Sequence, residues 1–120
     1  MNRKAIGEQA EQRACQYLQR HGLKLLQRNF RCRGGEIDLI MQHGDSLVFI
    51  EVRYRRRTAF GRAAETVSLL KQGRVIRCAQ VYINRYRCWN TAARFDVVSI
   101  EGEVDQMRID WIADAFQAGV

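Results

Sequence analysis

Hydrophobic positions near the start of the chain recur at the spacing of one helix face. The positions in question are Ile6, Ala10, Ala14, Tyr17 and Leu18. This pattern predicts an amphipathic helix over residues 5–21. Gly22 follows directly, where a glycine commonly ends a helix.

The pattern then shortens to that of strands. Three strands are predicted over residues 23–30, 36–41 and 46–53. The segment QHGD between the last two contains a glycine, as a tight hairpin requires. A two-residue turn at His43 and Gly44 would pair Gln42 with Asp45 and so set the register of the hairpin.

The second half of the chain returns to helical spacing and then to strand spacing. A helix is predicted over residues 65–84, with a core face that begins at Leu69. Strands over 93–101 and 104–109 and a short closing helix over 110–116 complete the pattern. The order α-β-β-β-α-β predicts an α/β fold with a single mixed β-sheet flanked by helices. The 120 residues suit one domain, residues 1–120.

The net charge of the chain bears on the kind of partner that it binds. The net charge is +7, and arginine supplies 17 of the 20 basic residues. Arginine makes planar, bidentate contacts with phosphate. An excess of basic residues in a small domain favours a nucleic-acid partner, although solubility alone also explains it.

Neither the N-terminus nor the cysteines suggest secretion. The first residues contain no apolar signal segment, and no apolar run is long enough to span a bilayer, so a cytoplasmic location without a membrane partner is expected. The cysteines form no CxxC pair and the chain has only two histidines. A zinc site is therefore not expected, and the cysteines are interpreted as buried or reduced thiols.

Acidic residues interrupt the two strands of the predicted hairpin. The predicted register places Glu36 opposite Glu51 and Asp38 opposite Phe49, so that Asp38 and Glu51 become diagonal neighbours about 7–8 Å apart. Two carboxylates directed at one point repel each other, and a divalent cation removes that repulsion. Hard oxygen ligands of this kind suit Mg²⁺ or Mn²⁺.

Simpler explanations exist for each acid taken alone. Glu36 and Glu51 could form ion pairs with Arg33, Arg53 or Arg55 across the hairpin. Glu11 falls at the margin of the apolar face of the first helix and is expected to point along the sheet toward the site. As a single residue it could equally be a solvated acid paired with an arginine.

The combination of motifs resembles a known family. The segments GGEIDLI, VFIEVRYR, FGRAAETVSLLKQ and RFDVV are similar to those of the YraN family of largely uncharacterised bacterial proteins, over about residues 10–116. The Asp and the Glu-x-Arg resemble the motif of the PD-(D/E)xK nuclease superfamily. That resemblance implies a restriction-endonuclease-like core similar to archaeal Holliday-junction resolvases, which act as dimers.

The resemblance also implies roles for individual residues. Asp38 and Glu51 would hold Mg²⁺ or Mn²⁺ together with Glu11, which matches a first-helix glutamate of the resolvases. Arg53 occupies the position of the superfamily lysine. Because arginine keeps its proton, Arg53 cannot act as a base but can stabilise charge on a phosphate.

The expected function is a metal-dependent endonuclease that acts on structured or branched DNA, with DNA favoured over RNA. Tyr54 is expected to stack on a base or fill a gap. The residues expected to hold the nucleic-acid backbone are Arg55, Arg56, Arg57, Lys71 and Arg74. One alternative is a nucleic-acid-binding module without catalytic activity. Another is an assembly subunit, which would need an exposed apolar patch that the sequence does not show.

Overall fold

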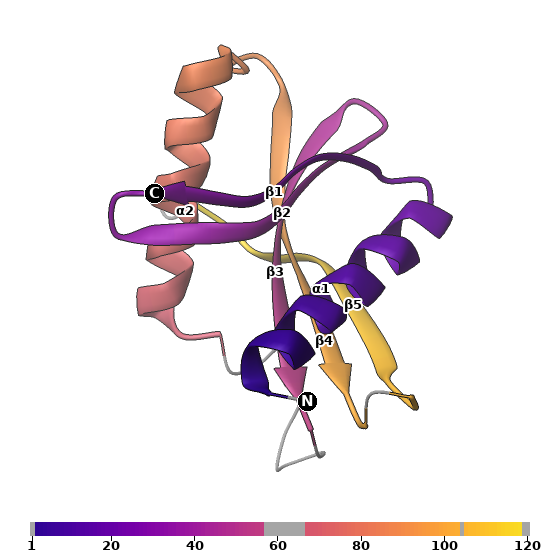
Figure 1. Ribbon diagram of the computed structural model, residues 1–120. Coiled ribbons are helices and arrows are strands. Elements are labelled where there is room, and N and C mark those ends of the chain that lie inside the picture. The colour runs from indigo at the N-terminus through magenta and orange to yellow at the C-terminus, as the bar shows by residue number, and fades with distance from the viewer. Residues whose placement is uncertain (1, 57–66, 104, 119–120) are drawn as a thin grey trace.

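Five strands form one mixed sheet, with a helix packed on each face (Figure 1). The computed structural model describes residues 2–56, 67–103 and 105–118. The elements are α1 (Arg3–Arg20), β1 (Lys24–Cys32), β2 (Gly35–His43), β3 (Ser46–Arg55), α2 (Leu69–Tyr86), β4 (Ala92–Glu101) and β5 (Arg108–Phe116). The predicted α/β class and the mixed sheet are confirmed.

The strands lie in the sheet in the order in which they occur in the chain, from β1 to β5. Neighbouring strands are antiparallel except for β3 and β4, which are parallel. A parallel pair needs a crossover connection, and α2 lies in that connection. None of the described helices is long and apolar enough to cross a membrane.

The core has two layers because successive strand residues point to opposite faces. Val48 and Ile50 of β3 pack with α1, whereas Leu47 and Phe49 pack with α2. The α1 layer is centred on small side chains, including Ala10 and Ala14, which let the helix approach the sheet closely. The predicted core face of the first helix is thus confirmed.

The second helix begins later than predicted and is rotated. Ser68 is its N-cap, and the Ser68 hydroxyl accepts a hydrogen bond from the backbone N–H of Lys71. Residues 65 and 66 lie outside the described part of the chain. Leu69 is 84% exposed, so the core face does not begin there as predicted. The residues of α2 that are buried are Val75, Cys78, Ala79 and Tyr82.

The predicted closing helix over residues 110–116 is wrong, because that segment belongs to strand β5. Ile109 and Trp111 alternate toward the α1 layer, and backbone pairing with β4 outweighs the local helical pattern. The register shifts between Phe95 and Val97, and Asp114 in the bulged part of β5 has a left-handed φ of 54°. That conformation is incompatible with a helix.

The predicted hairpin register is also wrong. The turn between β2 and β3 consists of Gly44 and Asp45, and His43 pairs with Ser46. Gly44 has a φ of 60°, which suits the first central position of a hairpin turn. Moving the glycine from the second turn position to the first shifts each pairing by two residues, so every side chain keeps its predicted face.

Two cysteines form a disulfide, contrary to the interpretation of all four as buried or reduced thiols. Cys32 at the end of β1 is bonded to Cys78 of α2, and their Cα atoms lie 5.5 Å apart. The hairpin between β1 and β2 approaches the helix very closely at Gly35. A Cβ atom there would lie 3.3 Å from both the Arg74 carbonyl oxygen and the Cys78 sulfur. The absence of a side chain at Gly35 therefore allows the hairpin to approach α2 closely enough for the disulfide to form.

Candidate functional site

The strands β2 and β3 separate at the point where the acidic residues occur. Their ladder of paired residues ends at Leu39 and Ile50. Beyond this pair, β2 continues along β1 while β3 continues along β4, and Figure 1 shows the two strands diverging. Asp38 and Glu51 are the first residues past the last pair. They therefore face each other across the split, instead of diagonally as the predicted register gave.

At this split, the side chain of Asp38 accepts a backbone hydrogen bond from β3 in place of a carbonyl group of β2. Its Oδ2 atom accepts a hydrogen bond of 2.8 Å from the backbone N–H of Val52, which follows Glu51 on β3. Asp38 is only 7% exposed. The hydrogen bond fixes the orientation of the carboxyl group next to Glu51.

Glu51 is an unusual acid because it is only 2% exposed. Burial raises the pKa of Glu51 far above its ordinary value, and the adjacent carboxyl group of Asp38 raises it further. Its Oε2 atom is buried and has no hydrogen-bond partner among the described residues. Two carboxyl groups in this position need either a shared proton or a bound cation.

Lys71 of α2 brings a positive charge to the pair. Its amino group lies 3.9 Å from Oε1 of Glu51, and its side chain is 43% exposed. Lys71 is predicted to hold the nucleic-acid backbone, and the structure places it at the carboxylate pair itself. The spacing of two residues puts Arg53 on the same face of β3 as Glu51, and Arg53 is half-buried.

Glu11 approaches the pair from α1, as its helical angle predicts. Its pKa is raised to about 7, first by burial and then by the negative charge of Asp38. Arg28 lies 4.0 Å from Glu11 and lowers the pKa, as does a hydrogen bond with the side chain of Asn29. Asn29 belongs to β1 and has a left-handed φ of 52°. Sequence patterns gave no signal for its part in the site.

Glu36 lies outside this cluster. It is exposed and forms an ion pair of 3.2 Å with Arg31, its direct cross-strand neighbour. The prediction that Glu36 faces Glu51 is therefore wrong. The idea that this acid pairs with a neighbouring arginine holds for Glu36, although its partner is none of the three arginines first considered.

The carboxylates do not form a complete set of metal ligands. Within the described ranges, no group of three or more His, Cys, Asp and Glu side chains is arranged to hold a metal ion. Asp38 and Glu51 are the two oxygen-donor side chains that the fold brings together, while Glu11 is coupled to them through charge.

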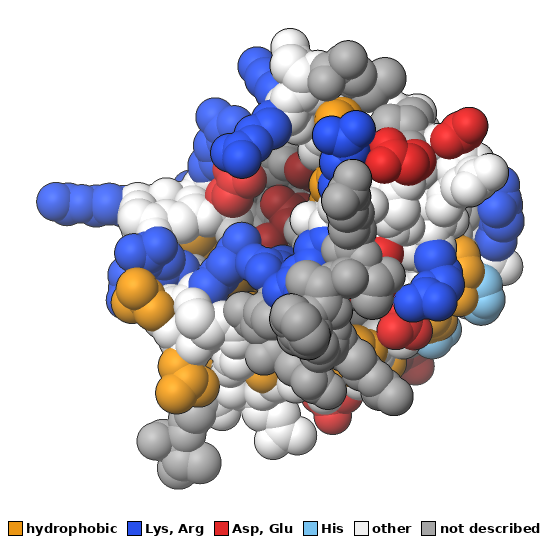
Figure 2. Space-filling model, turned by 90° about the horizontal axis from the view of Figure 1, so that it is seen from below, with side chains coloured by type: hydrophobic (Ala, Val, Ile, Leu, Met, Phe, Trp, Pro, Cys, Tyr) orange, Lys and Arg blue, Asp and Glu red, His pale blue; other side chains and the backbone are white. Residues whose placement is uncertain are grey.

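Basic side chains gather around recessed acidic side chains at one end of the molecule (Figure 2). Figure 2 views the end where α1 begins and β3 terminates, and it shows acidic side chains recessed in a hollow with Lys and Arg side chains around it. Arg56 at this end forms an exposed ion pair of 3.2 Å with Glu103. Arg74 lies on the exposed side of α2, near the turn between β1 and β2. Arg57 lies outside the described residues.

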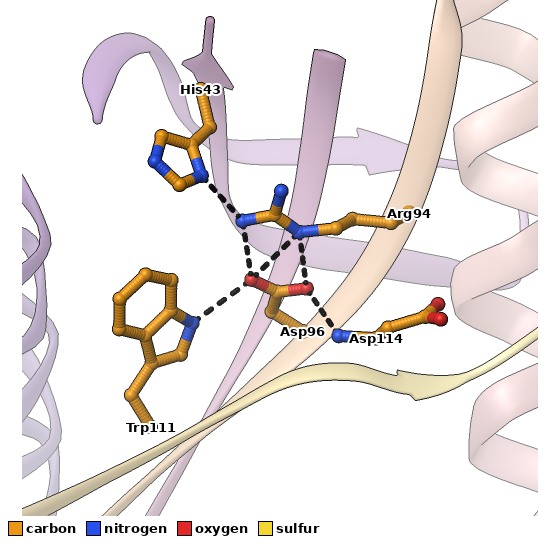
Figure 3. Close-up of polar contacts among 5 residues, drawn as sticks. All are labelled: His43, Arg94, Asp96, Trp111 and Asp114. Atoms are coloured by element: carbon orange, nitrogen blue, oxygen red, sulfur yellow. Dashed lines mark hydrogen bonds and ion pairs between the residues drawn. The ribbon is translucent and has the colours of Figure 1, made fainter. Parts of the chain in front are cut away.

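A second buried acid belongs to the RFDVV motif but serves the fold. Asp96 is fully buried, and its carboxylate accepts hydrogen bonds from Arg94, the Trp111 indole and the backbone N–H of Asp114 (Figure 3). Arg94 also contacts Nδ1 of His43 at 2.9 Å. Both oxygens of Asp96 are thus satisfied, and the network ties the bulge of β5 to β4 and to the end of β2.

The fold and the site define an α/β protein with a mixed sheet that splits around a buried carboxylate pair. Residues 10–100 match the model of the uncharacterised protein family UPF0102, and the chain belongs to this family. The resemblance to the YraN family is confirmed. The chain is 54% identical over 112 residues to a UPF0102 protein of Nitrosococcus oceani, covering 92% of this chain and 90% of the relative. It is 41% identical to one of Pseudomonas syringae pv. tomato (97% and 95%) and 45% identical to one of Stutzerimonas stutzeri (93% and 94%).

Proposed function

We propose that this protein is a metal-dependent endonuclease of the PD-(D/E)xK type that acts on structured or branched DNA in the cytoplasm. The observation that carries the proposal is the buried pair of Asp38 and Glu51 at the split between β2 and β3, with an oxygen of Glu51 that has no hydrogen-bond partner in the described part of the chain. A structural ion pair does not account for two facing carboxyl groups in a place where burial disfavours their charge.

The donor set fits Mg²⁺ or Mn²⁺ better than a metal that needs several protein ligands. Mg²⁺ is commonly held by one or two carboxylates, with water and substrate phosphate completing its coordination. Asp38 and Glu51 would hold the ion, and Glu11 lies close enough to sense the charge of Asp38. When bound, the ion would polarise a phosphodiester and lower the pKa of a water molecule.

The protein groups around the pair have distinct tasks under this proposal. The Val52 N–H orients Asp38 through its 2.8 Å hydrogen bond. Glu11, which lies within electrostatic reach of Asp38, would orient a water molecule beside the ion. Lys71 and Arg53 would stabilise the negative charge that develops on the phosphate. Arg55, Arg56, Arg57 and Arg74 would hold the backbone of the nucleic acid.

A nucleic-acid-binding module without catalysis is the second candidate, and the residue at position 53 favours it. Arginine stands where the PD-(D/E)xK motif has lysine, and it cannot be deprotonated to serve as a base. In such a module, Asp38 and Glu51 would share a proton at all times and would bind no metal ion. The same basic surface would then bind without cleavage.

A cleavage assay separates the two candidates. The purified protein is incubated with branched, duplex and single-stranded DNA in the presence of Mg²⁺ or Mn²⁺, beside Asp38→Asn and Glu51→Gln. The endonuclease proposal expects metal-dependent cleavage that both variants lose while they still bind DNA. The exposed Glu36→Gln is the matched control and should cleave as the wild type does.

Variants at position 53 refine the test. Arg53→Lys should retain or increase cleavage, whereas Arg53→Ala should lose about 2.7–4 kcal/mol of transition-state stabilisation with nearly unchanged affinity for DNA. Thermal melts of each variant exclude a loss of folded protein as the cause. If neither the wild type nor Arg53→Lys cleaves any of these substrates with either ion, the endonuclease proposal fails and the binding module remains.

A further inference from the structure

A cavity that the carboxylate site does not use lies between the beginning of α1 and the end of β3. Its volume is about 600 Å³, and the described residues that line it are Arg3, Ile6, Tyr54 and Arg56. Figure 1 shows the first turn of α1 beside the end of β3. The volume falls within the range of cavities that bind small molecules and cofactors, about 300–1,000 Å³.

The lining combines two guanidinium groups with an aromatic ring and an aliphatic side chain. Arg3 is exposed in the first turn of α1, and Arg56 forms the exposed ion pair with Glu103. An exposed ion pair contributes about 0–1 kcal/mol, so Arg56 can exchange Glu103 for a phosphate. The hydroxyl group of Tyr54 donates a 2.8 Å hydrogen bond to the Gly102 carbonyl, which fixes the position of the ring.

This chemistry matches one nucleotide unit. Sequence-independent binding of single strands uses basic groups along the backbone and aromatic rings on which bases stack. A base in a duplex is stacked on its neighbours and cannot lie against Tyr54 and Ile6. The occupant that fits both parts of the lining is therefore an unpaired nucleotide.

The cavity is close to the carboxylate pair along both elements that form it. Tyr54 follows Glu51 by three residues of β3, or about 10 Å at the rise of a strand, and its side chain points to the α1 face of the sheet, whereas that of Glu51 points to the α2 face. Ile6 precedes Glu11 by five residues of α1, or about 7.5 Å at the rise of a helix. A strand whose phosphate reaches the carboxylates thus has a neighbouring nucleotide within reach of the cavity.

We infer that the cavity between Arg3, Ile6, Tyr54 and Arg56 is a subsite for an unpaired nucleotide of the bound nucleic acid. Arg3 and Arg56 bind its phosphates, while the base lies against Tyr54 and Ile6. The inference deepens the proposed function and rests on it, because it makes the substrate a nucleic acid with an unpaired segment next to the reacting phosphate. It assigns to Arg3 and Ile6 a role that the sequence motifs did not suggest.

The test measures binding of a short fluorescent oligothymidylate to the full chain in EDTA, where no cleavage occurs. Arg3→Gln is compared with Lys4→Gln, which removes the same charge from the next, exposed residue on a different side of α1. Arg3→Gln should reduce the slope of log affinity against log salt by about 0.7, the value for one phosphate contact on a single strand. Lys4→Gln should leave the slope unchanged.

The base is tested separately. Tyr54→Leu should lower the affinity for oligothymidylate by about fivefold or more, the lower end of the effect of removing one stacking partner. Tyr54→Phe keeps the ring and removes the hydrogen bond to Gly102, so it should lose less affinity than Tyr54→Leu. For the wild type, an abasic oligomer of the same length should bind as weakly as oligothymidylate binds to Tyr54→Leu.

Several results would overturn the subsite. One is an equal effect of Arg3→Gln and Lys4→Gln on the salt slope. Another is equal affinity of the wild type for the abasic and the thymidylate oligomers. A third is tighter binding of a duplex of the same length, with an affinity that neither Arg3→Gln nor Tyr54→Leu changes. Thermal melts identify any variant that fails to fold. If Tyr54→Leu fails to fold, Arg3→Gln still tests the subsite, because Arg3 is exposed and its replacement should not affect folding. Because the readout is binding in EDTA, loss of the subsite and absence of metal-dependent cleavage are separate results.

Discussion

Replacing Glu51 by glutamine should change how the stability of the metal-free protein depends on pH. Glutamine has almost the shape of a protonated glutamate and carries no charge at any pH. In the wild type, burial and Asp38 raise the pKa of Glu51 well above 4.5, its ordinary value. The folded pair therefore keeps a proton that the unfolded chain releases at neutral pH.

The sign and size of the effect follow from this proton. A raised folded pKa contributes stability that is fully present below about pH 4.5 and is lost as the pH rises toward the folded pKa. Each pH unit in that window removes at most about 1.4 kcal/mol for each such group, so between about pH 5.5 and about pH 7.5 Glu51 alone should cost the wild type up to about 2.7 kcal/mol. Glu51→Gln should lack this part of the loss. The smaller slope that remains belongs to Glu11, whose pKa of about 7 places its own loss between about pH 4.5 and 7.

Urea denaturation in EDTA at three pH values measures this directly, with the exposed Glu36→Gln as the control for removing an acid. Adding Mn²⁺ to the wild type near pH 7.5 should restore about 2.7 kcal/mol at a concentration of about 100 times its dissociation constant. Glu51→Gln should show little of this gain. Equal pH slopes for the wild type and Glu51→Gln would refute the reasoning about the buried proton.

Three further outcomes test other parts of the structure. Asp96→Ala should reduce the free energy of unfolding by about 3–5 kcal/mol in urea denaturation, because it leaves a largely buried arginine without its carboxylate. Gly35→Ala should destabilise the protein by about 1–3 kcal/mol, because the new methyl group would crowd the Cys78 sulfur. The matched change Gly73→Ala, in open space within α2, should instead stabilise it by about 0.4–1 kcal/mol. Neutralising residues 55–57 together should reduce the salt slope of duplex DNA binding by about 0.9 for each phosphate that the protein no longer neutralises, and an unchanged slope would place the binding surface elsewhere.

The sequence by itself determined most of the elements and the positions of the acids on them. Helical and strand periods are properties of the local backbone, so the first helix and the three strands that follow could be predicted from spacing alone. The same periods placed Asp38 and Glu51 on adjacent strands and Glu11 at the margin of its helix. These predictions hold despite the wrong hairpin register, because a shift of two residues preserves the face of every side chain.

Only the tertiary structure decided which of these groups meet. Lys71 reaches Glu51, and Cys32 reaches Cys78 across 46 residues of chain, through the packing of α2 against the sheet. The pattern of residues 110–116 fits a helix locally, but pairing with β4 makes it a strand. Contacts of this kind depend on how distant segments bury each other's surfaces, and local spacing carries no information about that.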